Sequence, residues 1–209
     1  MMNRKTTRIV TRNRKRWLDQ AIKNLLEEGP QAVSVNRIAR QLRTSRSPFF
    51  HAFGSRKEFL RAMFDFYQQE TTIKVRESVE RFNGSPIERF WYFWFCIIEY
   101  QLFRYDYPFR QWSLMDPLIG KLIQKMDQNR MDFTRKLYLD MGYSEEEADH
   151  RASFNYHEYI GILVMGRPEI SPEWLKRRAK FRFYMHTTAP MPEDFKLPLL
   201  KSTHAENEK

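Results

Sequence analysis

Residues 34–60, SVNRIARQLRTSRSPFFHAFGSRKEFL, combine hydroxyl, guanidinium, imidazole and aromatic side chains at spacings that suit contact with DNA. Arg46 and Ser47 come first in a predicted short helix, where they would face a major groove, and arginine can pair bidentately with guanine there. Ser34 is predicted to cap the preceding helix, and the free backbone N–H groups at such an end bind phosphate. The chemistry of this segment is therefore recognition of a polyanion.

Two short helices must position these groups. Apolar residues recur at i, i+3, i+4 and i+7 over residues 35–42, which predicts one amphipathic helix. A second helix is predicted over 46–52, after a break at 43–45, with Ser45 or Ser47 as its cap and Pro48 in its first turn. Two short helices joined by a tight turn form a helix-turn-helix.

The charge distribution supports this interpretation independently. Residues 1–61 contain 15 Lys and Arg against 4 Asp and Glu, whereas residues 62–209 contain 21 against 22. A polyanion-binding protein concentrates positive charge where the polyanion docks, because each phosphate contact releases a counterion. The alternative is an ordinary solvated basic face, and the helix-turn-helix within the same segment argues against it.

The rest of the chain predicts an all-α fold. Ser-x-x-Glu capping signals begin at Ser55, Ser85 and Ser144, and prolines at 86, 117 and 172 suit first helical positions. The expected helices span 11–28, 35–42, 46–52, 56–82, 86–104, 117–141, 145–165 and 172–187, with a shorter piece near 108–115.

These helices suggest four regions. Residues 1–10 form a basic flexible arm, and 11–55 form a three-helix DNA-binding domain. Residues 56–188 form a larger helical domain for ligand binding and dimerisation, entered through a connecting helix over 56–82, and 189–209 form an irregular tail. The basic residues ahead of the first helix, Arg14 included, either follow a minor groove or the backbone, or form a disordered leader; both alternatives stay open.

The composition points to a cytoplasmic protein. The longest apolar run, residues 90–98, is nine residues long, and a membrane span needs about 20. The N-terminus is basic but has no apolar stretch behind it, so a secretory signal is not expected. Cys96 stands alone, which excludes an intrachain disulfide and favours a reducing compartment; we expect a buried structural thiol.

The segment from about residue 14 to residue 66 resembles the TetR/AcrR family of repressors. The matching positions include Ile38-Ala39, Leu42, Ser45-Arg46, Phe49-Phe50-His51, Phe53-Gly54-Ser55, Lys57-Glu58 and Leu60. The resemblance implies a regulator, most simply a repressor, that binds a pseudo-palindromic double-stranded DNA operator as a homodimer. The DNA-binding residues expected on this basis and from the motif are Ser34, Thr44, Ser45, Arg46, Ser47, Pro48, Phe50, His51, Arg56 and Lys57.

Three positions depart from the family pattern. Arg43 replaces the usual glycine of the turn, which is costly if the backbone there needs a positive φ. Phe50 replaces a tyrosine and so loses a phenolic hydrogen bond, and Ala52 replaces a second aromatic residue. These changes affect the operator sequence rather than the mode of groove binding.

The resemblance also implies an effector pocket and a dimer interface in the second domain. We expect a mostly apolar small molecule to bind among Trp91, Trp94, Phe95, Phe103, Phe109, Trp112, Met115 and His157, with Glu99, Arg110 and Glu158 as further polar anchors. In such proteins the last two long helices pair, here through Tyr156, Tyr159, Ile160, Leu163, Val164, Trp174, Phe181 and Tyr184. An aromatic stripe is also typical of plain core, and a constitutive architectural DNA-binding protein without an effector stays an alternative.

An enzyme is the remaining alternative. His150 and His157 share a helix face beside Asp149 and Glu158, but no third metal ligand follows at a recognisable spacing. The sequence contains no Gly-rich phosphate loop, nucleophile elbow or CxxC motif. We therefore expect no catalytic residue, no metal and no cofactor.

Overall fold

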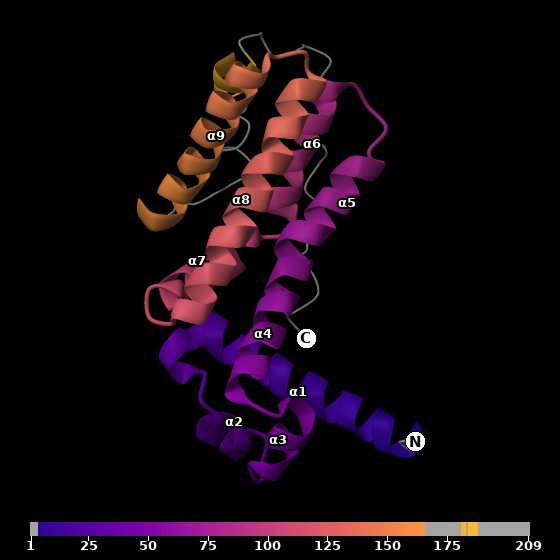
Figure 1. The fold of residues 1–209 in the computed structure, drawn as a ribbon, viewed down its shortest axis with the longest axis vertical. Coiled ribbons are helices and arrows are strands. Elements are labelled where there is room, and N and C mark those ends of the chain that lie inside the picture. The colour runs from indigo at the N-terminus through magenta and orange to yellow at the C-terminus, as the bar shows by residue number, and fades with distance from the viewer. Residues whose placement is uncertain (1–3, 166–180, 183, 188–209) are drawn as a thin grey trace, which may run out of the picture. The chain divides into compact units, whose positions relative to one another are not determined.

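The computed structural model describes residues 4–165, 181–182 and 184–187, and within them the chain is helical without a strand (Figure 1). The all-α class is confirmed. The elements are α1 (Arg4–Glu28), the 3-10 turn η1 (Pro30–Ala32), α2 (Val35–Gln41), α3 (Ser47–Phe53), α4 (Arg56–Gln68), the π-helical turn η2 (Gln69–Ile73), α5 (Lys74–Arg81), α6 (Pro86–Glu99), α7 (Leu102–Ser113), α8 (Pro117–Asp140) and α9 (Glu145–Met165).

Several predicted boundaries are confirmed and others are wrong. The prediction for α9 matches, and Ser85 with Glu88 forms a complete capping box at the start of α6. Helix α1 already begins at Arg4, so the expected start at residue 11 is wrong. The helix expected over 86–104 ends at Glu99, because Gln101 has a φ of 49°, and α7 then begins at Leu102 instead of near 108.

The chain divides into two compact units. The first consists of residues Met1–Lys74 and Leu102–Gln128, and the second of Val75–Gln101 and Asn129–Lys209. The DNA-binding helices therefore share a unit with all of α4, with α7 and with the first half of α8, rather than separating at the predicted boundary after residue 55. Most of the helix predicted over 172–187, and the whole predicted tail over 189–209, lie outside the described residues; 181–182 and 184–187 are helical.

One continuous aromatic core holds the first unit together. Phe49 of α3 lies 5.2 Å from Trp17 of α1 and 5.1 Å from Phe59 of α4, measured between ring centroids. The core continues along α4 to Tyr67, whose ring stacks on Phe109 of α7 at 4.2 Å, and then to Ile119 of α8. Burial of these rings fixes the helix-turn-helix to the helices behind it.

The second unit is built around α6. Phe90 is fully buried and its ring centroid lies 5.0 Å from that of Tyr138 on α8. Cys96 is buried on the same helix, as expected, and burial raises the pKa of its thiol to about 11, so the thiol is protonated at neutral pH. No helix of the described chain is long and apolar enough to cross a membrane.

Candidate nucleic-acid interface

Helix α2 begins with the predicted serine cap. Ser34 has an extended backbone, and its hydroxyl oxygen accepts a hydrogen bond from the N–H of Arg37 at 3.3 Å. Arg37 also pairs with Glu28 of α1, which ties the start of α2 to the end of the preceding helix. Ser34 is exposed, so the helix end at which the sequence predicts a phosphate contact is open to solvent.

The turn between α2 and α3 is a Schellman motif. The N–H of Thr44 donates to the carbonyl of Ala39 at 3.0 Å, and the N–H of Arg43 donates to that of Arg40 at 3.1 Å. Arg43 has a φ of 51°, in the left-handed region that this motif requires. The strain expected at the position where glycine is usual is therefore present.

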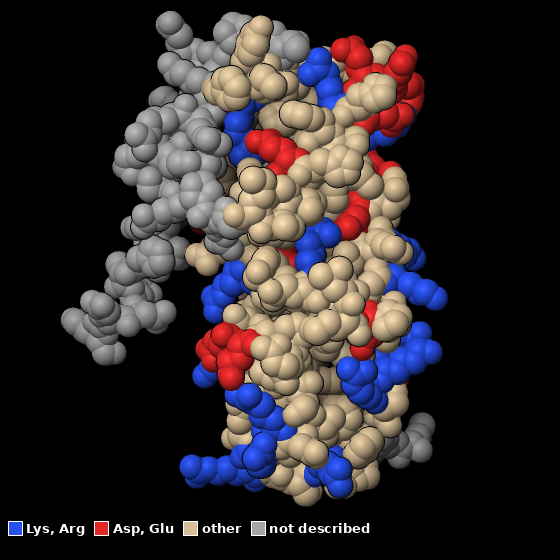
Figure 2. Space-filling view, turned by 90° about the vertical axis from the view of Figure 1, so that its left-hand side faces the viewer, with Lys and Arg blue, Asp and Glu red and all other residues tan. Residues whose placement is uncertain are grey.

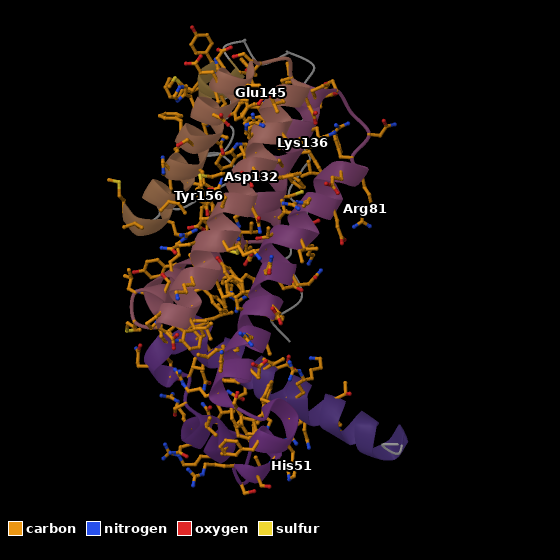
Figure 3. The ribbon with its side chains drawn as sticks, in the orientation of Figure 1. His51, Arg81, Asp132, Lys136, Glu145 and Tyr156 are labelled. Atoms are coloured by element: carbon orange, nitrogen blue, oxygen red, sulfur yellow. The ribbon has the colours of Figure 1, made fainter. Side chains whose placement is uncertain are left out.

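Helix α3 has a buried inner face and an exposed outer face, the arrangement that a recognition helix requires. Phe49 and Phe53 are buried, whereas Arg46, Ser47 and His51 are exposed and Phe50 is 53% exposed. Ser45 is also exposed, and Thr44 and Pro48 are half-buried. His51 marks this outer side in Figure 3. Figure 2 shows Lys and Arg side chains at the lower end of the view, the end at which the DNA-binding helices lie.

The predicted cap of α3 is wrong. Arg46, rather than Ser45 or Ser47, occupies the cap position, and its backbone is helical instead of extended. Its guanidinium can only donate, so it makes no capping bond in the described structure. The carbonyl of Arg46 instead accepts the N–H groups of Phe49 and Phe50 at 3.0 and 3.4 Å. Pro48 does lie in the first turn, where its missing N–H costs nothing.

Two cationic residues open helix α4 beside the recognition helix. Ser55 caps α4 by accepting the N–H of Glu58 at 3.2 Å, and both Arg56 and Lys57 are exposed. The guanidinium of Arg56 lies 3.2 Å from Oδ2 of Asp116, a residue whose other oxygen accepts the N–H of Leu118 at the start of α8. The expected phosphate ligand therefore already has an acidic partner, which the sequence did not reveal.

Sequence reasoning also missed two residues that support the interface. Asn24, on α1, is buried and bridges α1, η1 and α2 through its amide. Arg14, one of the basic residues expected either to follow DNA or to lie in a disordered leader, donates to the carbonyl of Ala52 at 3.0 Å. Both residues contact positions that are far apart in the sequence, where no local pattern predicts an interaction.

The residues expected to line an effector pocket are divided between the two units. Trp91, Trp94, Phe95 and His157 belong to the second unit, and Phe103, Phe109, Trp112 and Met115 to the first. Phe109 and Trp112 are buried in the core shared with the DNA-binding helices, Met115 is 63% exposed, and His157 is exposed on α9.

The residues expected at a dimer interface are also in different environments. Tyr156, Tyr159 and Leu163 are buried within the chain itself, so they are not available to a second copy, and Ile160 is half-buried. Val164, Phe181 and Tyr184 are 67%, 65% and 58% exposed. Trp174 lies outside the described residues.

Among the described residues, no three His, Cys, Asp or Glu side chains come together as metal ligands would. Three of the four residues of the enzyme alternative, His150, His157 and Asp149, are exposed on α9. The fourth, Glu158, accepts hydrogen bonds from Arg182 at 2.9 Å and from His186 at 3.0 Å. Burial alone would raise the pKa of Glu158, but these two partners outweigh burial and hold the pKa below its usual value.

Two short helices with a basic, exposed outer face on an aromatic core define a helix-turn-helix DNA-binding protein. Residues 18–63 match the family described as bacterial regulatory proteins, tetR family. This match lies within the DNA-binding helices, in the segment where the sequence resembles that family.

A solved structure shares the wider fold. It is a transcriptional regulator from Rhodococcus sp. Rha1, with a TM-score of 0.66 over 86% of this chain and 99% of that one. The two sequences are 16% identical, so the likeness concerns the fold alone. No curated protein matches the chain in sequence.

Proposed function

We propose that this regulator is a repressor that binds a pseudo-palindromic operator as a homodimer and leaves it when a mostly apolar small molecule binds. The observation that carries the proposal is the outer face of α3, where Arg46, Ser47, Phe50 and His51 are exposed above a buried aromatic core. Arginine at the start of such a helix can read guanine, and an apolar ring can contact a thymine methyl.

Selection of binding sites from random duplexes tests the DNA-binding part. We expect recovery of one sequence with two related halves about 34 Å apart, one helical turn of DNA. Equal affinity for selected and random duplexes, compared at one salt concentration, would refute sequence-specific binding.

The homodimer rests on recognition geometry and on an exposed face of α9. One short helix reads too few bases for useful specificity, and two-fold symmetry doubles the site. Phe154, His157, Gly161 and Val164 recur at i, i+3, i+7 and i+10 along the solvent-facing side of α9. A side chain added at Gly161 would meet open space, so a second helix could approach closely here.

Sedimentation at micromolar concentration tests the dimer. We expect a dimer for the wild-type chain and a shift to monomer for Gly161→Arg, because a guanidinium would block the close approach of the helix. Lys125→Glu, at an exposed position on α8 in the other unit, is the control and should sediment as the wild type does. A wild-type monomer would contradict the proposal.

We propose the effector site among three aromatic residues of α6, two of which are buried. Trp91, Trp94 and Phe95 carry it, because Phe109 and Trp112 belong to the core of the DNA-binding unit. The indole N–H of Trp94 is buried and makes no hydrogen bond within the described structure, and Arg182 lies 3.9 Å from the centre of its ring. A mostly apolar molecule with one acceptor group would satisfy that N–H.

Tryptophan fluorescence tests the effector, using a broad panel of apolar compounds and the operator found by selection. We expect at least one compound both to change the emission and to release DNA, and Trp94→Phe to remove most of the change. Because linkage is reciprocal, operator DNA must weaken binding of that compound by the same factor. If no compound releases DNA, the chain is the constitutive DNA-binding protein of the alternative hypothesis. We propose that the protein acts in the cytoplasm, where it would meet its operator. We propose no catalytic role for it.

A further inference from the structure

Helix α3 has weak support of its own. It has seven residues, its first residues receive no side-chain cap in the described structure, and it ends at Gly54, whose φ is 72°. Isolated helices of this length are unstable in water, because nucleation costs more than a few backbone hydrogen bonds return. Its orientation must therefore be fixed by contacts with other elements.

One such contact comes from Arg14, on the neighbouring helix α1 (Figure 1). Its Nη1 donates to the carbonyl of Ala52 at 3.0 Å, and the centre of its guanidinium lies 4.7 Å from the centroid of the Phe53 ring. Ala52 and Phe53 form the last turn of α3. A cation at this end satisfies a carbonyl that has no partner within the helix and interacts favourably with the helix dipole.

We propose that Arg14 is a positioning residue for the recognition helix: it anchors the end of α3 and so sets the sequence specificity of DNA binding without contacting DNA itself. The inference rests on the proposed DNA-binding function. The guanidinium binds α3 in two ways at once, through a charged hydrogen bond and through the face of Phe53. A lysine cannot reproduce that planar arrangement.

Positioning and phosphate contact have different consequences. An arginine that held a phosphate would contribute equally to all sequences, and its loss would lower the slope of log affinity against log salt by about 0.9. An arginine that positions α3 would contribute mainly to operator affinity, because random DNA is bound without alignment of the base-reading face.

The experiment compares Arg14→Ala, Arg14→Lys and Arg16→Ala, each titrated with the selected operator and with a random duplex over a range of salt concentrations. Arg16 is an exposed residue of α1, so its alanine variant removes the same charge without touching α3. We expect the ratio of operator to random affinity to fall about tenfold in Arg14→Ala. A tenfold change corresponds to the loss of about one hydrogen bond from a charged donor. The ratio should also fall several-fold in Arg14→Lys, despite its unchanged charge, and should stay within about twofold of wild type in Arg16→Ala.

Hydrogen exchange without DNA provides the second measurement. We expect the amides of residues 50–54 to exchange faster in Arg14→Ala and Arg14→Lys than in wild type, and unchanged in Arg16→Ala. Titration and hydrogen exchange fail separately. If the wild-type chain does not discriminate the operator from random DNA, the proposed function is refuted. Hydrogen exchange, which needs no DNA, still tests whether Arg14 anchors α3. Equal losses on both duplexes in Arg14→Ala, or a wild-type ratio in Arg14→Lys, would overturn the positioning role. If Arg14→Ala does not fold, the lysine variant decides.

Discussion

Replacement of Asn24 by leucine tests whether one buried amide holds the helix-turn-helix to α1. Asn24 is 1% exposed, and its Nδ2 donates to the carbonyl of Ala32 at 3.1 Å and to Oε1 of Gln41 at 2.8 Å. Its Oδ1 accepts from Nε2 of Gln20 at 2.9 Å. Three elements, α1, η1 and α2, thus meet at a single side chain.

The expected loss of stability depends on whether each hydrogen-bond partner of Asn24 can reach water once the amide is gone. Leucine has the same branched arrangement of side-chain heavy atoms as asparagine, so the change removes the hydrogen bonds without leaving a cavity. The buried carbonyl of Ala32 loses this donor at a cost of about 1–3 kcal/mol, while Gln20 and Gln41, which reach solvent, lose about 1 kcal/mol together. The free energy of unfolding should fall by about 2–4 kcal/mol, which lowers Tm by roughly 5–15 °C in a chain of this size.

Thermal and urea unfolding, followed by circular dichroism, measure this loss. Gln41→Ala is the matched control, because it removes one of the three bonds and leaves the Ala32 carbonyl paired; it should cost under about 1 kcal/mol. The urea m-value should stay unchanged in both variants. If Asn24→Leu costs no more than Gln41→Ala, the amide does not hold the three elements together and the reasoning fails.

Three further outcomes are expected. In anisotropy titrations, Arg46→Ala should cost about 1–3 kcal/mol and relax one base position, whereas Arg56→Ala should weaken binding to all duplexes and flatten the salt slope by about 1; indistinguishable variants would contradict these roles. Arg43→Gly should raise Tm by roughly 2–4 °C in calorimetry, because glycine relieves about 1 kcal/mol of left-handed strain, and a lower Tm would disprove that strain. Glu158→Gln should lower the urea midpoint at pH 7, because the ionised carboxylate stabilises the folded chain. A group whose folded-state pKa is lowered stabilises fully only above its unfolded-state pKa, about 4.3 for glutamate. The difference between the variant and wild type should therefore shrink below that pH and vanish as pH falls through the folded-state pKa. A difference that does not shrink as pH falls below the unfolded-state value would exclude this linkage.

Local signals predicted the parts of this fold that depend on neighbours in sequence. The apolar stripe over residues 35–42 and the serine cap at Ser34 correctly indicated α2, and Ser85 with Glu88 correctly indicated the start of α6. Phe49 and Phe53, four positions apart in α3, are both buried. Periodicity and capping act within one or two turns, which is why they can be read from the sequence alone.

The sequence predictions that were wrong depend on one break in the helical backbone and on contacts between residues distant in the sequence. The aromatic residues of 86–104 and those near 109–112 look like one stripe, but the left-handed backbone at Gln101 ends α6 and starts a new helix. Phe109 and Trp112 then belong to the core of the DNA-binding unit, so the predicted pocket residues do not share one unit. Arg14 contacts a carbonyl 38 positions away, and no local pattern distinguishes it from its basic neighbours.

The two broken local rules in the helix-turn-helix lie at the surface proposed to meet DNA. Arg43 occupies a position that favours glycine, and α3 begins without the serine cap that its sequence offers. Both choices weaken the isolated segment, yet they leave the side chains of Arg43, Ser45 and Ser47 exposed on this proposed surface. Local rules are commonly broken at functional sites, where stability is supplied from elsewhere. Here the buried ring of Phe49 and the guanidinium of Arg14 supply it from the side of α3 that faces α1, so the outer face stays open for recognition.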